Sequence, residues 1–246
     1  MGIYTVYSIM KMVCENWTTI HDAGLLRTMA EIYVLPILNP WGFVHTGETI
    51  SGVPIPGRQN YNGVNLNRNF PTMNWELTET GVNYSGASAG SEYETKIAMY
   101  YANLIKPDFF LDAHTGGMNS FGAMGAIEAT QEDGVAGLAY AMARTSTTIL
   151  MTEDSSFGES ADVSLIDVNP FTATGEMASW AYENICRVSF LTEQCNETKW
   201  LNGVLTNSVQ AYNTDTIYRE NMQITMNVIL HCLYMASIIR SRSTRI

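Results

Sequence analysis

Basic residues are scarce in this chain: 13 lysines and arginines stand against 24 aspartates and glutamates in 246 residues, for a formal net charge of −11. Proteins that bind nucleic acid need clustered Lys and Arg to displace the counterions of the phosphates. The one basic cluster lies within the last residues, 240–245, where it is more typical of a helix end. The composition therefore argues against nucleic acid as a partner.

Cysteines and long apolar runs are also limited. None of the four cysteines is spaced as C-x-x-C, so neither a zinc knuckle nor a thioredoxin-like motif is indicated. We expect most of them to be free and buried, and Cys186 and Cys195 could pair if the chain reversed sharply between them. No apolar run reaches the ~18 residues of a membrane helix, and the first residues lack a signal-peptide pattern. We therefore expect a soluble chain with no membrane partner, in a compartment that the sequence leaves open.

What the chain does contain is typical of a globular protein, with 46% apolar and 15% charged residues. The length suits one α/β domain and no linker composition interrupts it, so we expect a single domain over residues 1–246. Helices that alternate with strands indicate an α/β sandwich, and Ser91-x-x-Glu94 has the pattern of a capping box. The expected helices lie at 4–17, 91–105, 134–149, 175–184 and 215–239, and the expected strands at 31–38, 108–113 and 186–192.

The segment GRQNYNGVNLNRNFP, residues 57–71, lies within a long predicted loop and concentrates arginine and asparagine. Arg58 and Arg68 each offer a planar fork of donors that matches a carboxylate, and Asn67 adds an amide donor. The Asn62-Gly63 pair predicts a tight turn that would fold the arginines toward one another. This pattern indicates an anion site, with ordinary solvated surface arginines as the alternative.

Two polar residues follow predicted strands. His114 ends the strand at 108–113, and Glu193 follows the strand at 186–192. Ligands of α/β sheets bind beyond the carboxyl ends of the strands, although a lone histidine there is also typical of a structural hydrogen-bonding group. A metal ligand, a carboxylate base and cationic groups are what metal-assisted hydrolysis requires. We therefore treat both residues as candidates for that chemistry.

Five motifs follow one another across residues 31–195. They are Asn39-Pro40-x-Gly42-Phe43, the 57–71 segment, Tyr84-x-Gly with Ser-Glu-x-Glu-Thr95, Asp112-Ala-His114, and Phe190-Leu-Thr-Glu193. Their order and spacing resemble the zinc carboxypeptidases of the carboxypeptidase A type. The resemblance implies a three-layer sandwich with a mixed sheet of about eight strands between helices. It also implies a hydrolase that removes the C-terminal residue of a peptide with the help of one zinc ion.

The resemblance also implies a role for each candidate residue. His114 corresponds to the third zinc ligand, and Glu193 to the general base that activates the zinc-bound water. Arg58 corresponds to the residue that polarises the scissile carbonyl and binds the oxyanion, and Asn67 with Arg68 to the pair that binds the substrate's terminal carboxylate. The expected partner is a peptide with a free C-terminal carboxylate.

The chain departs from the family pattern at the metal. The family's first two ligands come from a His-x-x-Glu motif, which would fall upstream of Met1. We therefore expect a domain that is incomplete at its N-terminus, lacks its first strands and holds zinc weakly. His45 and Glu48 spell the same motif, but they follow the 31–38 strand instead of preceding it, so we do not expect them to bind the metal.

Further departures concern the substrate. Phe171 stands where the family has a mobile tyrosine, so it keeps an apolar lid without the hydroxyl donor. The glycines at 116 and 117 would widen a subsite, and Ala178, near the side-chain pocket, gives no support to a preference for basic residues.

Two alternatives to a carboxypeptidase stay open. One is a metal-free relative that binds peptide carboxylates without cleaving them, which metal content would separate from the enzyme. The other is a deacylase of N-acyl amino acids, from a related group that shares an Asn-Arg-x-Phe-Pro signature. The run Asn39-Pro40-x-Gly42-Phe43 favours the peptidase over this second alternative.

Overall fold

The computed structural model describes residues 2–45, 49–50, 53–54, 57–114, 123–124, 174–186 and 189–193. The chain divides into two compact units. The first comprises Met1–Val34, Asp108–Pro170 and Val188–Ile246, and the second comprises Leu35–Pro107 and Phe171–Arg187. This division leaves the single-domain prediction untested. The helices predicted at 134–149 and 215–239 lie outside the described residues.

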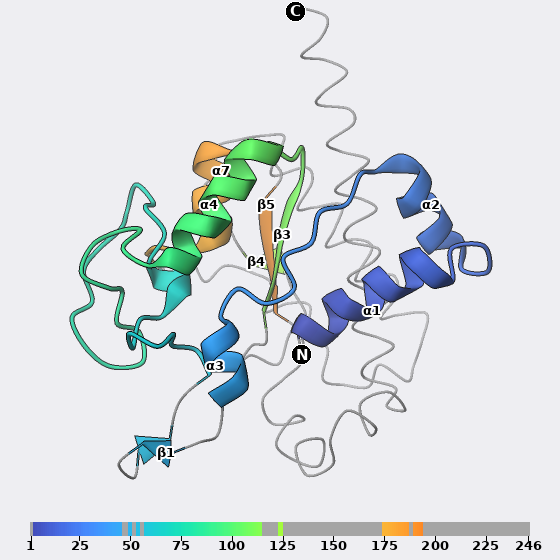
Figure 1. Cartoon of the computed structure of the whole chain (residues 1–246). Helices are drawn as coiled ribbons and strands as arrows, with labels where there is room; N and C mark the ends of the chain where they lie inside the picture. Colours follow the sequence, from blue (N-terminus) through green and yellow to red (C-terminus); the bar gives the residue numbers. More distant parts are fainter. Residues whose placement is uncertain are drawn as a thin grey trace, which may run out of the picture. The chain divides into compact units, whose positions relative to one another are not determined.

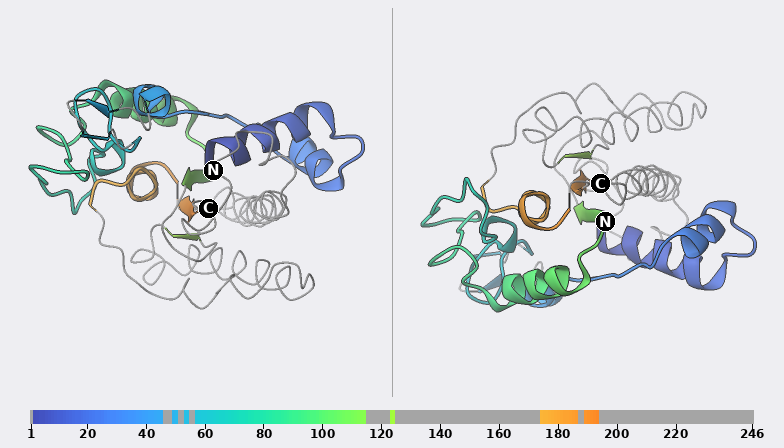
Figure 2. Two further views of the ribbon diagram at one scale, coloured as in Figure 1. Left: turned by 90° about the horizontal axis from the view of Figure 1, so that it is seen from below. Right: turned by 90° about the horizontal axis from the view of Figure 1, so that it is seen from above.

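The first unit begins with two helices, α1 (Gly2–Glu15) and α2 (His21–Met29), which lie beside one another in Figure 2. Ile9 of α1 and Ala23 and Leu26 of α2 form a buried apolar cluster between them. Burial of such side chains stabilises a helix pair by removing apolar surface from water. The helix predicted at 4–17 is thus confirmed, although it starts and ends two residues earlier.

The same unit holds a three-stranded sheet in the order β3-β5-β4. Its strands are β3 (Phe110–His114), β4 (Ala123–Met124) and β5 (Ser189–Glu193). Figure 1 shows β3 and β5 side by side; they are parallel, whereas β4 pairs with β5 in the antiparallel sense. The strands predicted at 108–113 and 186–192 are therefore confirmed. Each ends at the residue expected to act there.

The strand predicted at 31–38 is wrong. The structure describes all of these residues and assigns them to no strand, with Ile32, Tyr33 and Leu35 largely exposed. An apolar run becomes a strand only where a neighbouring strand supplies partners for its backbone hydrogen bonds. Such a ladder does not form along 31–38, and the boundary between the two units falls inside the segment.

The second unit is built from short elements and two longer helices. They are α3 (Pro40–His45), the hairpin strands β1 (Thr49–Ile50) and β2 (Val53–Pro54), the 3-10 turn η1 (Leu66–Arg68), α4 (Tyr93–Ile105) and α7 (Met177–Asn184). Phe70, which follows η1, packs against Trp180 of α7 with ring centroids 5.8 Å apart. The long loop predicted between residues 39 and 90 therefore contains short regular elements, and its second half packs against α7 through Phe70.

Helix α4 ends as predicted but does not start as predicted. Lys106 closes it with a left-handed backbone (φ 49°), and its N–H donates to the carbonyl of Ala102. At the other end, Glu92 is the N-cap and makes no side-chain capping hydrogen bond, so the prediction of a capping box at Ser91 is wrong. The hydroxyl of Ser91 donates instead to the Glu92 carboxylate at 2.7 Å. The side-chain amides of Asn69 and Asn60 donate to the Ser91 hydroxyl and the Glu94 carboxylate at 3.0 and 3.3 Å, so distant side chains occupy the groups that a local cap would have used.

None of the described helices is long and apolar enough to cross a membrane. Two cysteines, Cys14 and Cys186, lie in the described part of the chain. Cys14 is a free, exposed thiol and Cys186 is partly buried, so Cys14 is an exception to the expectation that most of the cysteines are buried.

Candidate functional site

The arginine segment begins with a tight reversal of the chain. Gly63 adopts φ +75°, a left-handed conformation that side chains other than glycine rarely adopt. Its N–H donates to the carbonyl of Asn60 at 2.9 Å, and the N–H of Asn60 donates to the carbonyl of Val64 at 2.9 Å. A single antiparallel bridge joins Gln59 to Asn65 beyond the turn. The predicted Asn62-Gly63 turn is therefore confirmed.

A buried carboxylate anchors this turn. Glu92 accepts hydrogen bonds from the side-chain amides of Asn60 and Asn62, both at 2.8 Å, and from Ser91 at 2.7 Å. Burial by itself raises the pKa of Glu92, but these three hydrogen bonds and the nearby Lys96 charge outweigh it, and the pKa lies below its ordinary value. The carboxylate therefore stays ionised and holds the turn against the start of α4.

Asn69 provides a second anchor just after η1. Its amide nitrogen donates to the carbonyls of Ser85 and Ser88 at 2.7 and 3.0 Å, and its amide oxygen accepts from the N–H of Glu92 at 3.2 Å. Gly86 passes so close that a Cβ there would lie 2.7 Å from this amide nitrogen. The two anchors together fix both sides of the segment that carries the arginines.

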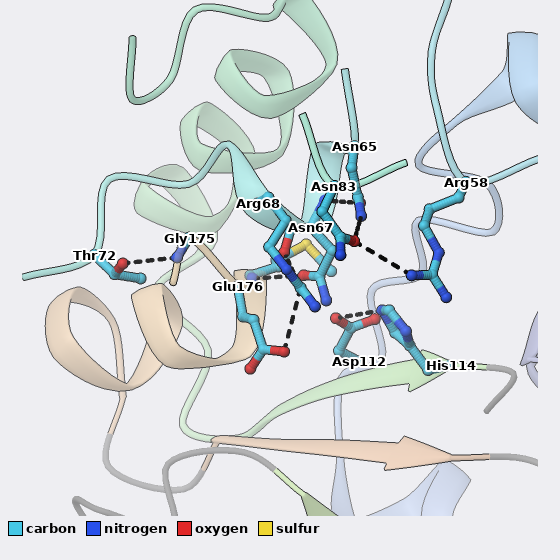
Figure 3. A network of polar contacts seen from close by, with 11 residues as sticks. Arg58, Asn65, Asn67, Arg68, Thr72, Asn83, Asp112, His114, Gly175 and Glu176 are labelled. Carbon is cyan, nitrogen blue, oxygen red and sulfur yellow. Dashed lines mark hydrogen bonds and ion pairs between the residues drawn. The ribbon is translucent and has the colours of Figure 1, made fainter. Parts of the chain in front are cut away.

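Arg58 and Arg68 are held differently within this frame (Figure 3). The exposed Arg58 donates through Nη1 to Oδ1 of Asn83 at 3.4 Å, and Asn65 donates to the same oxygen at 3.2 Å. Nη1 of Arg68 donates to the backbone carbonyl of Asn67 at 2.6 Å and lies 3.5 Å from Oε1 of Glu176. Arg58 is thus presented to solvent, whereas Arg68 is tied to its surroundings.

Asn67 has one end of its side-chain amide engaged. Its oxygen accepts from the N–H of Met177, the first residue of α7, at 2.8 Å. None of the described residues accepts from its amide nitrogen, which can therefore donate to a ligand. The structure thus places Arg58, Asn67 and Arg68 in one unit and on one hydrogen-bonded frame.

The other candidates lie in the first unit, at the carboxyl ends of its parallel strands. His114 and Glu193 are register partners at the ends of β3 and β5, so their backbones are adjacent. Nε2 of His114 lies 3.3 Å from Oδ2 of Asp112, a nearly buried carboxylate two residues earlier on β3 (Figure 3). Sequence reasoning assigned no role to Asp112, although alternate residues of a strand share a face. A carboxylate beside an imidazole typically orients a metal-binding histidine.

The described residues do not complete a zinc site. A catalytic zinc has three protein ligands and an open position. No group of three His, Cys, Asp or Glu side chains in the described ranges is arranged to hold a metal ion. Oδ2 of Asp112 is buried without a hydrogen bond within these ranges, which leaves one acceptor beside His114. His114 and Asp112 therefore fit one part of a metal centre.

Several predicted residues cannot be placed. Phe171, Glu48 and the segment 115–117 lie outside the described residues.

Other residues that the sequence singled out are placed in the second unit. His45 ends α3 with its ring 4.8 Å from that of Trp41. Ala178 is completely buried in α7. Glu176 escaped the sequence analysis, although a carboxylate directly after Gly175 at a predicted helix start was a visible signal.

The fold is that of known carboxypeptidases. The crystal structure of thrombin activatable fibrinolysis inhibitor superposes with a TM-score of 0.64 and 17% identity, over 94% of this chain and 58% of that one. The carboxypeptidase A of Helicoverpa armigera gives a TM-score of 0.60 and 20% identity, over 94% of this chain and 57% of that one. At this level of identity the likeness shows the fold.

Comparison of sequences identifies the family. The family model described as zinc carboxypeptidase matches residues 1–220, so the chain belongs to the zinc carboxypeptidase family. The catalytic chain of mouse carboxypeptidase N is 27% identical over 113 residues, 44% of this chain. That match covers 23% of the relative, so the chain spans only a part of its length. The resemblance stated from the five motifs is confirmed.

Proposed function

We propose that this chain is a carboxypeptidase-type hydrolase that recognises a peptide by its free C-terminal carboxylate and releases the C-terminal residue. Family membership supports a peptide substrate. The observation that carries the proposal is the anchored arginine segment, which presents Asn67 and Arg68 from one 3-10 turn. The fold likeness also supports the finer expectation of a mixed sheet of about eight strands between helices.

The proposed binding step uses donors that are already positioned. The substrate carboxylate would accept from the guanidinium of Arg68 and from the amide nitrogen of Asn67, whose oxygen is already engaged by Met177. Arg58, exposed and held by one long hydrogen bond to Asn83, would donate to the oxygen that becomes negative as the scissile carbonyl is attacked. Positioning these donors in advance lowers the cost of ordering them when substrate binds.

The proposed chemical step rests on Glu193. A carboxylate at the end of a strand can accept the proton of the attacking water and then pass it to the leaving amine. His114, the register partner of Glu193, is the one family metal ligand proposed for the described residues, and the Asp112 carboxylate lies 3.3 Å from its Nε2. The family is zinc-dependent, and the two further protein ligands that a catalytic zinc requires would have to come from residues beyond those described.

The test compares three substrates with the zinc-supplemented protein: a peptide with a free C-terminus, the same peptide as a C-terminal amide, and an N-acyl amino acid. The proposal expects cleavage of the free peptide alone, with release of its last residue detected by mass spectrometry. Binding of the free peptide without cleavage would support a non-catalytic relative. Turnover of the N-acyl amino acid alone would support the deacylase.

A further inference from the structure

The backbone of Arg68 lies directly against the segment that leads into α7. A Cβ added at Gly175 would collide with the carbonyl oxygen of Arg68, so only glycine fits there. The N–H of Gly175 donates to the hydroxyl of Thr72 at 3.0 Å, and its carbonyl accepts from the N–H of Phe70 at 3.1 Å. The segment from 174 to 177 is therefore docked on the chain around the arginine at a fixed position.

This docking places a carboxylate beside the proposed substrate clamp, which consists of Asn67 and Arg68. Glu176 follows Gly175 and is the N-cap of α7, while the next residue, Met177, donates its N–H to Asn67. Oε1 of Glu176 lies 3.5 Å from Nη1 of Arg68. The exposed fractions of the two side chains are 11% and 18%, so solvent screens the pair only weakly.

The distance shows that the pair is loose. A strong charge-assisted hydrogen bond between a guanidinium and a carboxylate is about 2.7–2.9 Å long. At 3.5 Å the attraction between the charges persists, whereas most of the hydrogen-bond energy is absent. The same nitrogen donates a short hydrogen bond to the Asn67 carbonyl. This hydrogen bond positions the guanidinium, and the longer contact with Glu176 contributes mainly through charge.

We infer that Glu176 is an internal competitor of the substrate carboxylate at Arg68, and that its negative charge sets how weakly the clamp binds a peptide's C-terminus. This inference rests on the proposed role of Arg68. A substrate carboxylate is the same chemical group as the Glu176 side chain, so the two repel one another in a weakly screened site. Specificity for a free C-terminus then depends on a residue that does not contact the scissile bond.

The test removes the charge of Glu176 and keeps its shape. Dissociation constants for one peptide and its C-terminal amide are measured by calorimetry in a Glu193→Gln background, so that the peptide is not cleaved. Glu176→Gln should tighten the free peptide about three- to tenfold and leave the amide unchanged. Glu183→Gln is the matched control, because it removes a carboxylate of α7 that accepts from the backbone of Met73. It should change neither constant.

Arg68→Ala distinguishes failure of the carboxylate clamp at Arg68 from failure of the competitor role of Glu176. If it weakens the free peptide selectively while Glu176→Gln leaves that peptide unchanged or weakens it, the competitor role is wrong and the clamp stands. If Arg68→Ala affects the free and amidated peptides equally, the clamp itself is wrong, and the competitor role falls with it. Thermal unfolding of each variant verifies that the variants are folded before binding is measured.

Discussion

The two regions that carry the candidate residues are held in place by different means. The arginine segment has no ladder beyond one bridge, and buried side chains of Asn60, Asn69 and Glu92 hold it. The strand ends that carry His114 and Glu193 are held by the backbone register of a parallel pair. A loop that presents donors thus needs many specific side chains, whereas a strand end needs only its neighbour.

This difference affects how each region should respond to substitution. Replacing a buried amide or carboxylate in the loop leaves its former partners unsatisfied, which costs stability as well as function. Replacing an end residue of a strand leaves the backbone hydrogen bonds unchanged, so the chemistry can be lost while the fold is kept. Four predictions test this contrast, from the largest effect to the smallest.

The largest effect is expected at a strand end. Glu193→Gln should lower kcat for a free-C-terminus peptide by about 10²–10⁴-fold, because a neutral amide cannot accept the proton of the attacking water. Zinc content and the melting temperature should stay at the wild-type level. The measurements are steady-state kinetics, metal analysis and thermal unfolding. Turnover retained in the variant would remove Glu193 from the mechanism.

In the loop, Arg68→Ala should weaken binding of a free-C-terminus peptide by about 10- to 100-fold, because a charge-assisted pair of hydrogen bonds is lost. The amidated peptide should lose far less. Arg27→Ala is the matched control, because Arg27 lies over the ring of Trp17 in the first unit and removal of its charge should affect neither peptide. Equal losses for both peptides would contradict a carboxylate clamp.

Stability of the loop should depend on Glu92. Glu92→Gln should lower the free energy of unfolding by about 1–2 kcal/mol at neutral pH, because the asparagine amides lose a charged acceptor in a buried site. The folded-state pKa lies below the ordinary 4.5, so this stabilisation is present above that value and is lost as the pH falls through the folded-state pKa.

Urea unfolding of the wild type and Glu92→Gln across a pH series provides the measurement, and the difference between them should shrink below pH ~4.5. Glu94→Gln is the control, since Glu94 receives only longer contacts from Asn60, both at 3.3 Å. A difference that stays constant with pH would mean that the Glu92 charge does not hold the turn.

The smallest effect, of opposite sign, is expected at Glu183. Burial raises the pKa of this carboxyl group, and the hydrogen bond from the Met73 backbone only partly opposes it. Its contribution to stability is therefore present below the ordinary pKa of 4.5 and is lost as the pH rises through the folded-state value. At neutral pH the free energy of unfolding of Glu183→Gln should exceed that of the wild type by less than about 1 kcal/mol, because solvent screens this partly exposed group. A loss of stability at neutral pH would contradict this sign.

Sequence reasoning succeeded where one short pattern decides the structure. The Asn62-Gly63 turn needs only a residue that tolerates a positive φ, and the strands ending at His114 and near Glu193 follow from short apolar runs. It failed at 31–38 and at the capping box of Ser91. In both places the outcome depends on which distant groups are available as partners, and a local pattern does not contain that information.

The sequence by itself determined the family, the order of the motifs and the identity of the residues proposed for catalysis and carboxylate binding. Only the tertiary structure decided their partners: Asp112 beside His114, Glu92 beneath the turn, and Glu176 on Arg68. The physical reason is distance along the chain. Glu176 is 108 residues from Arg68, and only packing around Gly175 brings its charge to the arginine.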